Sequence, residues 1–233
     1  MLEKKLYLMR GIPGSGKSTS AKKIVDENKL NYIESVFSTD NFWIPSCFKL
    51  KNIDFSNLED KDLINLCLSF NSIVENSSIN KQFHINFGNG NYIDCLNIIL
   101  KNIEEIQKIE YIKNFNLDKL HVAHKKNKAL FEDAVSKNIN IIIIDNTNVT
   151  IKEGSFYVKY AHENNYEIII KEPESPHWLK NRHLLKSKIN NKEWQEFADL
   201  LFNKNTHGVP KHVILNMMNN WIFDPKVKDY LNS

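Results

Sequence analysis

The sequence predicts an α/β fold, a parallel sheet with helices on both of its faces, from three observations. A short apolar run, residues 6–9, leads through a glycine-rich turn into a helical segment, residues 19–27. Residues 139–144 (INIIII) are the most hydrophobic stretch of the chain, which is typical of an interior strand covered on both faces. A helical segment, residues 150–160, then precedes another apolar strand, residues 166–171. This alternation of strands and helices is the pattern of an α/β domain.

The composition indicates a protein that has a single hydrophobic core and resides in a reducing compartment. The chain has 233 residues, of which 42% are hydrophobic, enough for one sizeable core and an inserted subdomain. The formal net charge of +3 is compatible with an anionic substrate. The three cysteines lack C-x-x-C spacing, which argues against disulfides and zinc. With no signal peptide and no apolar stretch of about 20 residues, we expect a cytoplasmic protein without a membrane partner.

The first turn carries the clearest motif. Residues 11–18 (GIPGSGKS) fit the phosphate-binding pattern G-x-x-x-x-G-K-[ST] at every fixed position, between a strand and a helix as the pattern requires. The glycines let consecutive N–H groups point at phosphate oxygens, and the helix N-terminus adds its positive dipole end. Lys17 would reach the β- and γ-phosphates, and Ser18 would ligate Mg²⁺. The predicted nucleotide-binding residues are Gly11, Pro13, Gly14, Ser15, Gly16, Lys17, Ser18 and Thr19.

A second predicted strand, residues 32–38, ends at Thr39-Asp40. A carboxylate at the carboxyl end of a parallel strand lies where ligands bind in open α/β sheets. Asp40 is therefore a candidate catalytic base. Its position alone is equally consistent with a structural role, in which Asp40 caps the following segment.

The middle of the chain has a weaker pattern. We interpret residues 42–114 as a mostly helical insertion, with helical spacing in residues 60–74 and 92–112, between core segments 1–41 and 115–233. Residues 117–137 follow as an amphipathic helix. It contains the spacing H-x-x-H, but no third ligand accompanies it, so a polar helix face explains it better than a metal site.

The predicted central strand ends in an acidic turn, Asp145-Asn146-Thr147-Asn148. An apolar strand followed by an acid has the Walker B form, in which the carboxylate helps to hold the metal, and it also suits a capped turn into the next helix. Residues 174–207 are basic and helical, as expected of a kinase lid. Within them Arg182 stands out, because the chain has only one other arginine, Arg10, and a guanidinium suits bidentate phosphate contact. Residues 223–233 are predicted to lie at the surface.

Six segments occur in one order: GIPGSGKST, FSTD, AHKKN, IIIIDNTN, IIIKEPESPHW and NKNTHGVP. In these segments the chain resembles the P-loop polynucleotide-kinase branch that includes the NEDD-binding-protein-two-like proteins. It is also similar to the kinase-like domain of 2′,3′-cyclic-nucleotide 3′-phosphodiesterase. The resemblance covers residues 5–40 and roughly 115–220.

The resemblance implies Mg²⁺-dependent phosphoryl transfer from ATP to a hydroxyl, typically the 5′-OH of DNA or RNA. It favours the general-base role for Asp40, since in-line transfer needs a carboxylate to accept the hydroxyl proton. It makes Asp145 a metal ligand. It adds Lys204 as a catalytic lid residue beside Arg182. It also implies nucleotide contacts for Asn148, Thr206 and His207.

Two alternatives stay open. The bacteriophage-type kinases follow the base with a phosphate-gripping arginine, whereas this chain has Asn41, which favours a small-molecule or nucleoside kinase. A lysine at position 204, where related sequences tend to have arginine, favours a catalytically weak nucleotide-binding interaction module. The sequence contains no N-K-x-D guanine motif, which argues against a GTPase switch.

Overall fold

The computed structural model describes residues 3–44, 108 and 111–233. The chain divides into two compact units, Met1–Phe42 with Phe115–Ser233 and Trp43–Asn114. The predicted insertion helices, residues 60–74 and 92–112, lie outside the described residues apart from a few positions, so they stay predictions.

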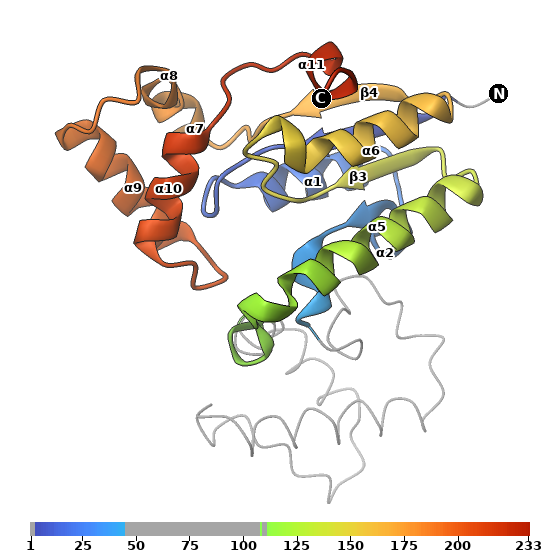
Figure 1. Cartoon of the computed structure of the whole chain (residues 1–233), viewed down its shortest axis with the longest axis horizontal. Coiled ribbons are helices and arrows are strands. Elements are labelled where there is room, and N and C mark those ends of the chain that lie inside the picture. The colour runs from blue at the N-terminus through green and yellow to red at the C-terminus, as the bar shows by residue number, and fades with distance from the viewer. Residues whose placement is uncertain (1–2, 45–107, 109–110) are drawn as a thin grey trace, which may run out of the picture. The chain divides into compact units, whose positions relative to one another are not determined.

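The larger unit is built on a four-stranded sheet, shown in Figure 1. Its strands are β1 (Lys5–Met9), β2 (Val36–Phe37), β3 (Ile141–Ile144) and β4 (Glu167–Lys171), in the order β2-β3-β1-β4. Every pairing is parallel. The predicted α/β fold with a parallel sheet is therefore confirmed, and the apolar strand of residues 141–144 is an interior strand, as predicted.

Helices cover both faces of this sheet. On one face the strands pack against α5 (Leu120–Ser136) and α6 (Ile151–Glu163) through a fully buried core, and on the other against α1 (Lys17–Glu27). Figure 1 shows α6 in front of the sheet and α1 behind it. Alternate residues of β3 serve the two faces: Ile142 and Ile144 point to the first core and Ile143 to the second. Each such buried side chain stabilises the fold by about 1.5–3 kcal/mol.

The predicted strand of residues 32–38 is wrong over its first half. Residues Tyr32–Ser35 form the short helix α2, and only Val36 and Phe37 are extended. Asn31 explains the difference, because its side-chain oxygen accepts a hydrogen bond from the backbone N–H of Ile33 at 3.0 Å. This cap favours a helical turn over a strand. Edge strand β4, which was predicted as an apolar strand, is only half-buried.

A group of four helices stands beside the sheet: α7 (Pro176–Asn181), α8 (Leu184–Ser187), α9 (Lys192–Lys204) and α10 (Lys211–Asn220). Residues 174–207, which were predicted to be helical, thus contain three helices. They share an aromatic-rich core with two residues of the sheet's carboxyl edge, Ile12 and Val149. Because Ile12 belongs to the glycine-rich loop, this helical group packs directly on the loop.

Most of residues 223–233 lie at the surface, as predicted, but Pro225 and Tyr230 are buried, which the prediction missed. Helix α11 (Val227–Leu231) packs on α6, and its Tyr230 is fully buried in the core formed by β1, β3 and α6. Gly154 of α6 makes room for this side chain, since a Cβ there would lie 2.8 Å from the Tyr230 ring and 2.9 Å from Leu8.

Candidate functional site

The loop between β1 and α1 has the backbone that its glycines allow. Gly14 and Gly16 have φ angles of 82° and 88°, in the left-handed region. A Cβ on Gly14 would stand 2.0 Å from the carbonyl oxygen of Leu201 in α9. Ser18 and Thr19 are exposed in the first turn of α1, and Pro13 is partly exposed. Two of the loop's glycines thus adopt a backbone conformation that other residues rarely reach, while phosphate binding by the loop stays a prediction.

The start of α7 holds two carbonyl groups of this loop. The Ser175 hydroxyl donates to the carbonyl of Ser15 at 2.7 Å, and His177 Nε2 lies 2.9 Å from the carbonyl oxygen of Gly14. Sequence reasoning missed both residues. The signal available was their place in the segment EPESPHW, directly after a strand. These contacts fix the loop's carbonyls toward α7 and support its curled shape.

Lys17 and Asp145 form a buried ion pair at the base of the loop. Lys17 Nζ lies 2.6 Å from Asp145 Oδ1, and both side chains are less than a tenth exposed. Close by, the Ser15 hydroxyl is buried and has no hydrogen-bond partner in the described part of the chain. An unsatisfied buried hydroxyl costs about 1–3 kcal/mol, so this hydroxyl suits a ligand oxygen.

The acidic turn after β3 joins three strand ends. The backbone N–H of Asp145 donates to the carbonyl of Phe37 at 2.9 Å, and Asn146 accepts a bond from the backbone of Thr39 at 2.9 Å. Asn148 has a left-handed φ of 43°, and its amide donates to the carbonyl of Met9 at 2.7 Å. The amide nitrogen of Asn148 is therefore bound to the end of β1, and a nucleotide contact by this residue stays a prediction.

Asp40 lies at the same edge, in the 3₁₀ turn η1 (Thr39–Phe42) directly after β2. His207 Nε2 is 3.6 Å from Asp40 Oδ2, although the two residues are far apart in sequence. Asn205 shapes the turn that carries His207, since it accepts from the His207 N–H at 3.0 Å and donates to the Val209 carbonyl at 2.9 Å. Thr206, in the same turn, is exposed.

His124 of α5 lies next to Asp40. Its Nδ1 is 3.3 Å from the Thr39 hydroxyl. Burial lowers the pKa of His124, as does the nearby Lys128 ammonium, while Glu153 and Asp40 raise it to a smaller extent. Among the described side chains, no group of three or more His, Cys, Asp or Glu is placed to hold a metal ion.

Arg182 has carboxylate partners in this structure. Its Nε donates to Glu172 at 2.7 Å and its Nη2 to Asp224 at 2.5 Å, while the guanidinium lies 4.6 Å from the ring centroid of Phe223. These contacts favour a structural role. Lys204, the other lid residue, is exposed at the last position of α9.

Arg10, directly before the glycine-rich loop, is fully buried. Its guanidinium donates to the carbonyls of Asn148, Val149 and Ile222 at 2.8–3.0 Å and lies 4.2 Å from the Trp221 ring centroid. It thus connects the loop's strand, the acidic turn and the C-terminal segment. The rarity of arginine was the only sequence signal for this role.

Comparison with known proteins agrees with this geometry. A family profile described as an AAA domain matches residues 6–198. NEDD4-binding protein 2 of Homo sapiens is 24% identical over 216 residues, which cover 93% of this chain and 8% of that protein's length. No solved structure matches the chain. In the described residues, no helix is both long and apolar enough to cross a membrane.

Proposed function

The chain belongs to the AAA domain family, with a P-loop, kinase-like nucleotide-binding domain, and we propose that it transfers the γ-phosphoryl group of ATP to a hydroxyl, namely the 5′-OH of a polynucleotide. The observation that carries the proposal is the meeting of three strand ends. Lys17 follows β1, Asp145 follows β3 and Asp40 follows β2, and these strands are neighbours in the sheet. A cation, a metal-ligand carboxylate and a second carboxylate at one edge are the groups that phosphoryl transfer requires.

The loop would take the phosphates. The buried ammonium of Lys17 has Asp145 as its counter-charge in this structure, and a triphosphate would supply that charge instead. The Ser15 hydroxyl and the N-terminal N–H groups of α1 would donate to phosphate oxygens. Asp145 and Ser18 offer hard oxygen donors, which fit Mg²⁺. Bound Mg²⁺ would neutralise charge on the transferring phosphoryl group.

Asp40 would accept the proton of the acceptor hydroxyl. Its carboxylate is partly exposed, with 38% of the side chain accessible, as a group that meets an incoming substrate must be. Acid–base catalysis by a positioned side chain contributes about 10²–10⁴-fold to a rate. His207 would hold the carboxylate in place, and of the two lid candidates we favour Lys204 for phosphoryl contact, because Arg182 is bound to Glu172 and Asp224.

The test combines transfer and binding. The full chain is incubated with γ-labelled ATP, Mg²⁺ and a panel of acceptors: 5′-hydroxyl RNA, 5′-hydroxyl DNA and free nucleosides. We expect label on the oligonucleotides, lost in Asp40→Asn with ATP affinity retained, and weakened ATP binding in Lys17→Ala. Label on nucleosides alone would support the small-molecule kinase that the uncharged Asn41 favours. If no hydroxyl is labelled although ATP binds, the proposal fails and a nucleotide-binding interaction module is the better account.

A further inference from the structure

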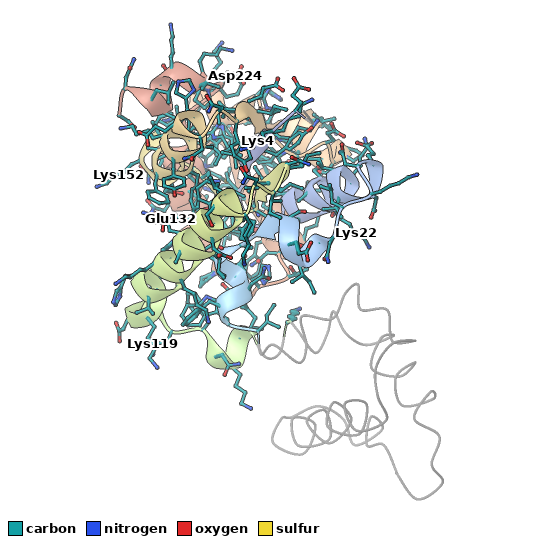
Figure 2. All side chains as sticks on the ribbon, turned by 90° about the vertical axis from the view of Figure 1, so that its right-hand side faces the viewer. Lys4, Lys22, Lys119, Glu132, Lys152 and Asp224 are labelled. Carbon is teal, nitrogen blue, oxygen red and sulfur yellow. The ribbon has the colours of Figure 1, made fainter. Side chains whose placement is uncertain are left out.

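The N-terminal half of α5 carries a concentration of positive charge. Between Asp118 and Glu132 the sequence has no acidic residue, but it has four lysines and two histidines. All six are exposed or partly exposed, and together we call them the α5 basic surface: Lys119, His121, His124, Lys125, Lys126 and Lys128. Figure 2 labels Lys119 near the start of the helix and Glu132 farther along it.

This surface adjoins the proposed catalytic base. Helix α5 packs on η1, the turn that contains Asp40: His124 contacts Thr39 at 3.3 Å, and Lys126 Nζ lies 5.6 Å from the ring centroid of Phe42. Thr39 and Phe42 are the two ends of that turn. Asn41, next to Asp40 in this turn, brings no charge of its own, and α5 carries positive charge to the same turn.

The lysines of the surface have no carboxylate partner among the residues that the structure describes. None of Lys119, Lys125, Lys126 and Lys128 forms an ion pair with any side chain that the structure describes, whereas Lys137 at the other end of α5 lies 2.7 Å from Asp133. Like charges three or four residues apart, such as Lys125 and Lys128, destabilise a helix by about 0.2–0.5 kcal/mol. An ordinary solvated helix face would carry acids among its lysines, so the arrangement suits an external polyanion.

We propose that the α5 basic surface binds the phosphate backbone of a single-stranded nucleic acid whose terminal hydroxyl reaches Asp40. This inference rests on the proposed function and names where the acceptor lies. From His121 to Lys128 the helix extends about 10 Å, which is long enough to face more than one phosphate of a strand. A nucleoside cannot span that length, so the surface discriminates a polymer from a small acceptor.

The test measures binding rather than turnover. A fluorescent, 5′-hydroxyl single-stranded oligonucleotide, as RNA and as DNA, is titrated with the full chain at several salt concentrations. The variant Lys125→Gln/Lys126→Gln/Lys128→Gln removes three phosphate contacts. The plot of log K against log salt should then become shallower by about 2, since each contact on a single strand contributes about 0.7. Affinity near physiological salt should fall roughly tenfold or more.

A matched control removes the same charge elsewhere. Three lysines outside the surface are replaced by glutamine, one each on α1, the end of α5 and α11: Lys22, Lys137 and Lys228. Both triple variants lower the formal net charge from +3 to 0. The control should bind the oligonucleotide with nearly wild-type affinity and salt slope, and unfolding midpoints should show that both variants are folded.

Several outcomes overturn the inference. These are no oligonucleotide binding by the wild type, equal losses in both variants, or equal affinity for poly-glutamate, which would make the surface a general anion binder. If the chain phosphorylates oligonucleotides but the α5 triple variant binds them as tightly as the wild type, the proposed binding surface is wrong and the proposed kinase activity stands. If binding depends on the surface but no phosphoryl group is transferred, the proposed kinase activity is wrong and the proposed binding surface stands. Tighter binding of RNA or of DNA would identify the acceptor.

Discussion

Replacing Arg10 by lysine tests how the loop, the acidic turn and the C-terminal segment are held together. The substitution keeps the positive charge and loses the planar fork. Arg10 donates to three carbonyls at 2.8–3.0 Å, and a single ammonium cannot reach all of them. A hydrogen bond to a charged group contributes about 1.5–3 kcal/mol, and a buried carbonyl left without a partner costs about 1–3 kcal/mol. Losing two of the three bonds should lower the free energy of unfolding by about 3–5 kcal/mol.

Equilibrium urea unfolding, followed by tryptophan fluorescence, measures this loss. The control is Arg182→Lys, because Arg182 is partly exposed and its carboxylate partners can remain solvated. Its loss should be below about 1 kcal/mol, as for surface ion pairs. Domains are stabilised by only about 5–15 kcal/mol, so Arg10→Lys should shift the midpoint strongly. If both variants shift the midpoint equally, Arg10 does not join these segments energetically.

Three further predictions follow from the geometry. Gly14→Ala should abolish ATP binding measured by calorimetry, because its Cβ would stand 2.0 Å from the Leu201 carbonyl oxygen; near-normal affinity would contradict the packing of α9 on the loop. Tyr230→Ala should cost about 3–5 kcal/mol in urea unfolding, whereas Tyr230→Phe should be nearly neutral, since the buried hydroxyl lacks a hydrogen-bond partner within the described residues. The Lys171 ammonium, with help from a second lysine, lowers the pKa of Glu174 from 4.5 to about 2. The stability that this carboxylate contributes is therefore present above pH 4.5 and is lost as the pH falls through about 2. An NMR titration of Glu174 should show that midpoint, and Lys171→Met should move it upward; an ordinary midpoint in the wild type would refute the pairing.

The short-range features of the fold follow from local spacing, and the sequence predicts them well. The strand of residues 6–9 became β1 and the run of isoleucines became β3, because alternating or continuous apolar residues have few other ways to be buried. The helices after the loop and after the acidic turn also formed where predicted. The first half of the second strand failed, because the side-chain cap of Asn31 outweighs the β-propensity of Tyr32 and Ile33.

In the candidate site, too, the sequence predicts the local motifs but not the contacts between distant segments. The conformation of the glycine-rich loop and the position of Asp145 were predictable, since both belong to contiguous motifs whose backbone demands are known. The neighbours of these motifs were not, because they come from distant segments. Ser175 and His177 hold the loop from α7, and His207 reaches Asp40 from the turn between α9 and α10.

By itself the sequence determined that this protein has a parallel α/β sheet and a phosphate-binding loop, because periodicity and glycine placement act within a few residues. Tertiary structure alone decided what Arg10, Arg182 and Tyr230 do. Arg10 is buried among backbone carbonyls, Arg182 is bound by two carboxylates, and Tyr230 fills the space above Gly154. Each of these contacts joins residues that only the folded chain brings together, and the packing and charge of those partners fix the role.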